Sequence, residues 1–305
     1  MMAKKVKTNI ALARERLLPT IFNSQIEKIV FNFIDPRMKE HVLLNGKLGG
    51  SPVFCIVHWN APEYVLLNVS QIELLYPNSK IYVLDNGSRQ ANINAVVEGL
   101  KRFSNVTLFA ASLRYPNWET RTGVDHLIYN HTKGLQFLLN YAAEQKDEIT
   151  VFLDQDCLLF NHIEDLFSKL GKNVILIGAK DGDTRGYDDL VHASFMILQP
   201  GRVNQLFGKF SFFCEHTKLP EPYHGLSLKA KGKILFLEIK PHGEKPVTSY
   251  SNQDTIYAWH AWFSAISCRG MSMSRLQARR KIAFEFMKQI HEETIAKTNY
   301  GSAHA

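Results

Sequence analysis

The stretch that decides the fold is Ile149-Thr150-Val151-Phe152-Leu153-Asp154-Gln155-Asp156, followed at once by Cys157-Leu158-Leu159-Phe160. A continuous apolar run of this kind predicts a strand buried on both faces of a sheet. Ionised carboxylates are costly to bury unless they are paired or hold a metal. The pair Asp154 and Asp156 at the strand end therefore predicts a hard divalent cation that also binds phosphate oxygens. The alternative is an ordinary acidic turn that ends the strand.

The composition indicates a folded protein with a mild preference for anionic ligands. The chain has 305 residues, 45% of them hydrophobic, and 19 Phe with 11 Tyr supply a proper core. The net charge of +7 leaves nucleotide phosphates, nucleic acid and anionic lipid as candidate partners. No apolar stretch approaches the length that spans a bilayer. The four cysteines are widely spaced and no signal-peptide core follows the basic start, so we expect a cytoplasmic location.

The chain is predicted to have three parts: a basic helical extension over residues 1–50, an α/β domain over 51–270, and a basic helix over 271–305. In the domain, apolar runs that read as strands alternate with stretches of helical periodicity. We expect strands over 53–57, 81–84, 106–110 and 149–153, separated by helices over 62–76, 91–103 and 123–143. Such alternation predicts a mostly parallel sheet flanked by helices.

The second half of the chain is less regular. Strands are expected over 174–178, 193–198 and 234–239, and a long helix over 273–297. That helix carries Arg275, Arg279, Arg280 and Lys281 beside the apolar residues Leu276, Ile282, Phe286 and Met287. Two interpretations stay open: a solvated helix whose apolar side packs on the domain, or peripheral contact with an anionic membrane surface.

Three polar clusters follow three of the expected strands. They are His58-Trp59-Asn60, Asp85-Asn86 and Asp154-Gln155-Asp156. In open sheets with parallel strands, ligands bind beyond the carboxyl ends of the strands. The three clusters are therefore expected to converge on one ligand site at this edge of the sheet.

These motifs, in this order, resemble those of nucleotide-sugar-dependent glycosyltransferases of the GT-A fold. The resemblance rests on Val53–Asn60, Tyr82–Ser88 and Val151–Asp156, and it covers roughly residues 50 to 200. It implies a Rossmann-like GT-A sheet with helical extensions at both ends. It also divides the domain into a nucleotide-sugar half over 51–160 and an acceptor half over 161–270. In that family, D-x-D carboxylates hold Mn²⁺ or Mg²⁺ against the diphosphate, and a late histidine often completes the metal site.

The resemblance also implies roles for single residues. The nucleotide would be bound by His58, Trp59, Asn60, Asp85, Asn86, His131 and Asp154. The metal ligands would be Asp154, Asp156 and a histidine, for which His260 is preferred to His242. Each of these residues also has a purely structural interpretation. Asp85 could end a strand-end turn, His131 could lie on a helix surface, and either late histidine could be a hydrogen-bonded core residue.

An inverting reaction would need a carboxylate that takes the proton of the acceptor hydroxyl. Asp254 is the first choice for this catalytic base, with Glu215 and Asp181 as reserves. A retaining reaction would need no such base. The chain lacks the acceptor and Gln-x-x-Arg-Trp motifs of processive inverting enzymes, so transfer of single sugars is expected.

The resemblance therefore implies a metal-dependent transferase that moves a sugar, from a UDP-sugar by preference, to a hydroxyl of a glycan, lipid or protein. One rival is a metal-dependent nucleotidyltransferase, although Val53–Asn60 lacks the glycine-rich phosphate loop usual there. The other rival is a non-catalytic binding or assembly protein with the same fold. Nucleic acid is not an expected partner, because the positive charge is dispersed and no aromatic-basic platform is present.

Overall fold

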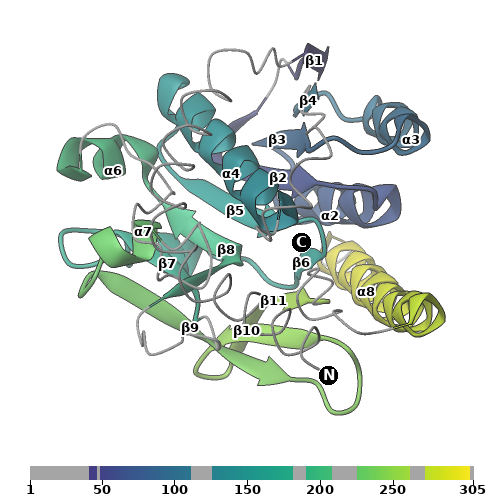
Figure 1. The fold of residues 1–305 in the computed structure, drawn as a ribbon. Coiled ribbons are helices and arrows are strands. Elements are labelled where there is room, and N and C mark those ends of the chain that lie inside the picture. The colour runs from purple at the N-terminus through teal and green to yellow at the C-terminus, as the bar shows by residue number, and fades with distance from the viewer. Residues whose placement is uncertain are drawn as a thin grey trace, which may run out of the picture.

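The computed structural model describes residues 41–46, 49–110, 126–180, 190–207, 225–261 and 272–302. Figure 1 shows one large mixed sheet with helices on both sides, which confirms the predicted α/β class. In the described residues the sheet has eleven strands in the order β1-β4-β3-β2-β5-β8-β7-β9-β10-β11-β6.

The first half of the domain is the parallel part of the sheet. Its strands are β2 (Gly50–His58), β3 (Ser79–Asp85), β4 (Val106–Ala110) and β5 (Thr150–Asp154), and its helices are α2 (Pro62–Leu75), α3 (Gln90–Leu100) and α4 (His126–Glu144). The pairs β2–β3, β3–β4 and β2–β5 are all parallel. The predicted alternation of strands and helices is thus confirmed, with boundaries shifted by a few residues.

Side chains of β2 alternate between two layers of core. Phe54 and Ile56 pack with residues of α2 and α3, whereas Val53, Cys55 and Val57 pack with residues of α4. Because helices cover both faces, every one of these side chains is buried, and the strand is apolar throughout instead of alternating. This burial explains why the apolar runs could be read as central strands.

The second half of the sheet is mainly antiparallel. β7 (Leu176–Lys180), β8 (Val191–Leu198), β9 (Ile234–Pro241), β10 (Thr248–Asn252) and β11 (Thr255–His260) make it up. Among its described strands, only β7 and β9 form a parallel pair. The short helices are α5 (Glu164–Phe167), α6 (Pro200–Phe207) and α7 (Gly225–Lys229).

The sheet curls so that its last strand returns beside its centre. β6 (Cys157–Leu159) follows β5 after the turn Gln155–Asp156, yet it pairs antiparallel with β11 at the far end of the strand order. This pairing sets His260 opposite Cys157, and the Ala261 N–H donates to the Asp156 carbonyl at 3.0 Å. The carboxyl end of β11 is thereby brought to the turn that carries the two aspartates.

The two ends of the chain fit the predictions unequally. Residues 41–44 were expected within a helical extension, but they form strand β1 (His41–Leu44), which pairs antiparallel with β4. The local sequence His-Val-Leu-Leu suits an added edge strand, and this pairing overrides the helical prediction at that point. Residues 1–40, which hold the rest of the expected extension, lie outside the described residues.

The expected C-terminal helix is confirmed as α8 (Met273–Ser302). Its apolar side packs against Tyr64 of α2 and Trp259 of β11, which buries Phe286 and Met287. These two side chains were expected to face a membrane in one interpretation, but they are covered by the domain. None of the helices in the described part of the chain is long and apolar enough to cross a membrane.

Candidate functional site

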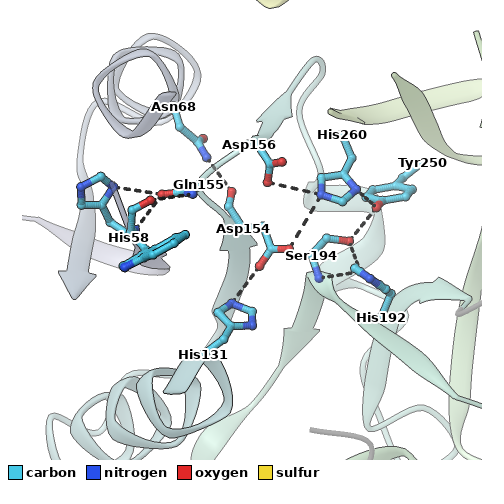
Figure 2. A network of polar contacts seen from close by, with 11 residues as sticks. His58, Asn68, His131, Asp154, Gln155, Asp156, His192, Ser194, Tyr250 and His260 are labelled. Atoms are coloured by element: carbon cyan, nitrogen blue, oxygen red, sulfur yellow. Dashed lines mark hydrogen bonds and ion pairs between the residues drawn. The ribbon is translucent and has the colours of Figure 1, made fainter. Parts of the chain in front are cut away.

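The D-x-D segment forms a tight turn between two strands (Figure 2). Asp154 ends β5, Gln155 and Asp156 make the turn, and Cys157 begins β6. Asn68 on α2 ties the two sides of the turn together, because its Nδ2 donates to the carbonyls of Asp154 at 3.2 Å and of Cys157 at 2.8 Å. The backbone that carries both carboxylates is therefore held from behind by a buried side chain.

Two carboxylates and one imidazole converge at this turn. His260 Nε2 lies 3.3 Å from Asp156 Oδ1 and 3.8 Å from Asp154 Oδ2. One ligand atom from each of the three residues lies within 4.8 Å of the others. Asp156 and His260 are buried and Asp154 is partly exposed, so an ion bound here would be enclosed on one side and open on the other. The donor set fits a divalent cation, because carboxylate oxygens and an imidazole nitrogen are common ligands of such ions.

His242, the other candidate for the late histidine, lies elsewhere. Its ring packs against Trp259 at 4.9 Å and Phe286 at 5.1 Å between centroids. It follows β9 on the side where α8 covers the domain, and its side chain is exposed. The preference for His260 over His242 at the aspartate pair agrees with this geometry.

His131 of α4 reaches the aspartate pair from the opposite side. Its Nε2 lies 2.9 Å from Asp154 Oδ1, so Asp154 stands between two histidines (Figure 2). Burial would raise the pKa of the Asp154 carboxyl, but the neighbouring imidazole of His131 holds that pKa well below its usual range. His131 is thus not a plain helix-surface residue: it stabilises the ionised form of a candidate metal ligand.

The middle residue of the motif, Gln155, joins the aspartate turn to the end of β2. Its Oε1 accepts from the Trp59 N–H at 2.8 Å, and its Nε2 donates to the Trp59 carbonyl at 3.2 Å. Regular pairing between β2 and β5 has ended at Val57 and Asp154, so this side chain takes the place of the next strand residue. Oε1 also lies 3.0 Å from His58 Nδ1, which must donate to it.

Trp59 presents its indole to solvent at this edge, with 43% of its surface exposed. An exposed aromatic ring can stack on the base of a nucleotide. The backbone on both sides of the indole is held by Gln155, so its position is well defined. Trp59 therefore offers a flat apolar surface beside the aspartate turn.

The side chains of Asp85 and Asn86 are buried at this edge of the sheet. Asp85 Oδ2 accepts from the N–H groups of Gly87 at 3.2 Å and Ser88 at 3.1 Å, while Oδ1 lies 3.7 Å from His58 Nε2. Asp85 and His58 are fully buried, and Asn86 nearly so. The predicted contact of these side chains with a nucleoside is thus not what this geometry supports: Asp85 closes a strand-end turn, the alternative noted for it.

Asn60 is also occupied by the protein itself. Its backbone has a φ of 52°, and its Oδ1 accepts from the Arg89 N–H at 2.8 Å and from Asn92 Nδ2 at 3.0 Å. The first bond satisfies a backbone N–H at the start of α3, where such groups have no partner within the helix, and the second adds a side chain of the same helix. The predicted nucleoside contact gives way to a structural role for this side chain.

The predicted catalytic base, Asp254, is wrongly placed for that role. It lies exposed in the turn between β10 and β11, at the opposite end of β11 from His260. Six residues of extended chain separate the two, which corresponds to roughly 20 Å at ~3.3 Å per residue. Glu215 and Asp181, the reserves for this role, lie outside the described residues.

Four further side chains bond to site residues and were not predicted to do so. They are Gln155 in the aspartate turn itself, and Asn68, Tyr250 and Ser194 on other strands and helices. Only Gln155 could have been suspected, because it lies between the two aspartates. The others depend on how β8, β10 and α2 meet.

No protein-family model matches the chain, and the search of curated proteins finds no match. Among solved structures, the chain is similar to the galactosyltransferase LgtC in complex with donor and acceptor sugar analogues, at 16% identity and a TM-score of 0.42. That match covers 61% of this chain and 73% of LgtC.

Two further solved structures show a similar likeness. The mannosyltransferase PcManGT from Pyrobaculum calidifontis, in complex with GDP-Man and Mn²⁺, has 14% identity and a TM-score of 0.41 over 74% of this chain and 64% of its own. The bifunctional glycosyltransferase WbbM has 12% identity and a TM-score of 0.44 over 64% of this chain and 40% of its own. All three are glycosyltransferases. The likeness is partial, so we base the function on the residues of this chain.

Proposed function

We propose that this chain is a metal-dependent glycosyltransferase of the GT-A type. It transfers a sugar from a nucleoside-diphosphate sugar, with a UDP-sugar favoured, to a hydroxyl group of a glycan, lipid or protein. The observation that carries the proposal is the convergence of Asp154, Asp156 and His260 at the carboxyl end of the parallel strands.

The proposed cation is Mn²⁺ or Mg²⁺. Asp154, Asp156 and His260 would hold it, and the open side at Asp154 would leave room for phosphate oxygens. Mg²⁺ prefers an all-oxygen set of ligands, so the imidazole nitrogen favours Mn²⁺. When bound, the cation would neutralise the charge that develops on the leaving diphosphate, a Lewis-acid contribution of several kcal/mol.

Three described side chains would prepare the site for the donor. Trp59 offers its indole as a stacking surface for the base, and Gln155 holds the backbone of Trp59 in place. His131 keeps Asp154 ionised, so that this carboxylate can share the cation. The sugar would then lie over the aspartate turn, with its bond to the diphosphate beside the cation site.

Some parts of the proposal rest on the sequence alone. For an inverting reaction Glu215 remains the proposed base, since Asp254 lies too far from the turn. A cytoplasmic location and contact of α8 with a membrane surface also remain predictions. Ile282 supports such a contact, because it is 53% exposed on the basic helix.

A donor assay tests the proposed activity. Purified protein is incubated with a panel of UDP-sugars and GDP-sugars with Mn²⁺, with Mg²⁺ or with EDTA, and release of nucleoside diphosphate is measured with and without a mixture of glycan acceptors. We expect release from one donor family that requires a divalent cation and is lost in Asp156→Ala. Cation-independent release, or equal release by Asp156→Ala, would contradict the proposal.

A further inference from the structure

A chain of buried hydrogen bonds leads away from His260 toward the centre of the sheet (Figure 2). His260 Nδ1 lies 2.7 Å from the Tyr250 hydroxyl, which lies 2.6 Å from Ser194 Oγ. Ser194 Oγ lies in turn 2.7 Å from His192 Nδ1. Tyr250 and Ser194 are fully buried and His260 nearly so, while His192 is partly exposed. The chain thus begins at a candidate metal ligand on β11 and ends on β8.

The direction of every bond in the chain follows from one backbone group. The Ser194 N–H donates to His192 Nδ1 at 3.1 Å, so Nδ1 carries a lone pair and no proton. The Ser194 hydroxyl must then donate to the same nitrogen and accept from the Tyr250 hydroxyl. Tyr250, having donated its proton, can only accept from His260, whose proton is therefore on Nδ1.

We propose that Tyr250, Ser194 and His192 are positioning residues for the metal ligand. They hold the imidazole of His260 so that Nδ1 donates its proton to the Tyr250 hydroxyl. Nε2 is then directed toward the carboxylates of Asp154 and Asp156, as the ligand atom that a cation requires. This inference rests on the cation site of the proposed function and adds three residues that never touch the cation.

A bound cation would also account for the close approach of His260 Nε2 to Asp156, which is unfavourable without it. His260 Nε2 and Asp156 Oδ1 lie 3.3 Å apart, and when Nδ1 carries the only ring proton both atoms present lone pairs to each other. Two such atoms repel each other unless positive charge lies near both. A divalent cation supplies that charge. The other tautomer would let Nε2–H donate to Asp156, and it would occupy the lone pair that the cation needs.

The first arm of the test reads the tautomer directly. The metal-free protein is labelled with ¹⁵N-histidine, and long-range ¹H–¹⁵N spectra are recorded near pH 7.5. The signal of His260 is identified by its absence in His260→Gln. We expect the Nδ1–H pattern in the wild type. An Nε2–H pattern would overturn the inference, and the pattern itself is read in the wild type, with His260→Gln needed only for the assignment.

The second arm measures Mn²⁺ affinity by electron paramagnetic resonance. Tyr250→Phe and Ser194→Ala each interrupt the series of hydrogen bonds from His260 to His192. We expect each to weaken Mn²⁺ binding about 10- to 100-fold, the range usual for partners of metal ligands. Tyr257→Phe and Ser251→Ala are matched controls on the same hairpin. Tyr257 donates its hydroxyl to Asp165, and Ser251 Oγ has no hydrogen-bond partner among the described residues.

The outcomes separate this inference from the proposed function. Mn²⁺ binding by Tyr250→Phe and Ser194→Ala as tight as by the controls would overturn the positioning role while leaving the cation site intact. If Tyr250→Phe does not fold, Ser194→Ala and the wild-type tautomer decide the question. Failure of the wild type to bind Mn²⁺ at all would instead contradict the proposed function, and with it the role of the chain.

Discussion

Replacing Gln155 by alanine tests whether this side chain joins the aspartate turn to the end of β2. The substitution removes its bonds to the N–H and carbonyl of Trp59 and to Nδ1 of His58. Each such bond contributes ~1 kcal/mol net, and a buried donor left unpaired costs ~1–3 kcal/mol. Water can replace the bonds to exposed Trp59 but not the bond to buried His58. We therefore expect the free energy of unfolding to fall by ~2–3 kcal/mol.

Urea unfolding followed by circular dichroism measures this change. Gln155→Asn keeps the amide but shortens the side chain by one carbon–carbon bond, ~1.5 Å, so it should recover little of the loss. Gln289→Ala is the control, because it removes a single bond to Glu293 on the exposed face of α8 and should cost under ~0.5 kcal/mol. If Gln155→Ala costs no more than Gln289→Ala, the proposed link between the two strand ends is wrong.

Three further outcomes are expected. Trp59→Ala should weaken nucleotide binding by ~1–3 kcal/mol, the usual value of one base–aromatic stack, with Mn²⁺ affinity unchanged; equal nucleotide affinity in calorimetry would exclude the stacking role. Gly134→Ala should destabilise the protein by ~1–3 kcal/mol, because its Cβ would lie 2.9 Å from buried Val57. Gly201→Ala, whose Cβ would meet none of the described residues within 4 Å, should instead gain ~0.5–1 kcal/mol in thermal or urea unfolding. Burial lowers the pKa of His291, so the unfolded state binds a proton first as pH falls below ~6.5; stability should therefore fall between pH 7 and 5, with a shallower slope in His291→Gln when unfolding is measured across that range.

The sequence predicted the parallel half of the sheet well, because strands buried on both faces are apolar throughout. Val53–Val57 and Ile149–Leu153 are runs of this kind, and both are central strands. The aspartate pair at the end of β5 was recognisable for the same reason: carboxylates after a buried strand are conspicuous. The choice of His260 drew on the aromatic residues around it, and the pairing of β11 with β6 agrees with that choice.

The sequence could not predict where the hairpin of β10 and β11 would point. Thr248–Asn252 is polar and shows no apolar run, so β10 was missed, and Asp254 was assigned to the site although it lies at the far turn. Only the pairing register decides which end of β11 meets the aspartates. A sequence shows local periodicity, but register between distant strands depends on tertiary packing.

The strand-end clusters illustrate a second limit. Asp85 and Asn60 are polar residues after buried strands, as Asp154 is, but their side chains bond to the nearby loop and to α3. A turn and a ligand site use the same residue types at such positions. The distinction depends on which donors lie within hydrogen-bonding distance, and that is set by the fold and not by the motif.

The measurement that tests the central claim most directly is calorimetric titration of UDP and GDP into the protein, with and without Mn²⁺. It compares the wild type with Asp156→Ala and with the control Asp254→Asn. The Asp254 side chain is exposed in the turn between β10 and β11, away from the aspartate pair. The account predicts that one nucleotide binds only with Mn²⁺, equally well to wild type and Asp254→Asn, and not to Asp156→Ala. Absence of binding to the wild type under every metal condition, or binding that survives in Asp156→Ala, would contradict it.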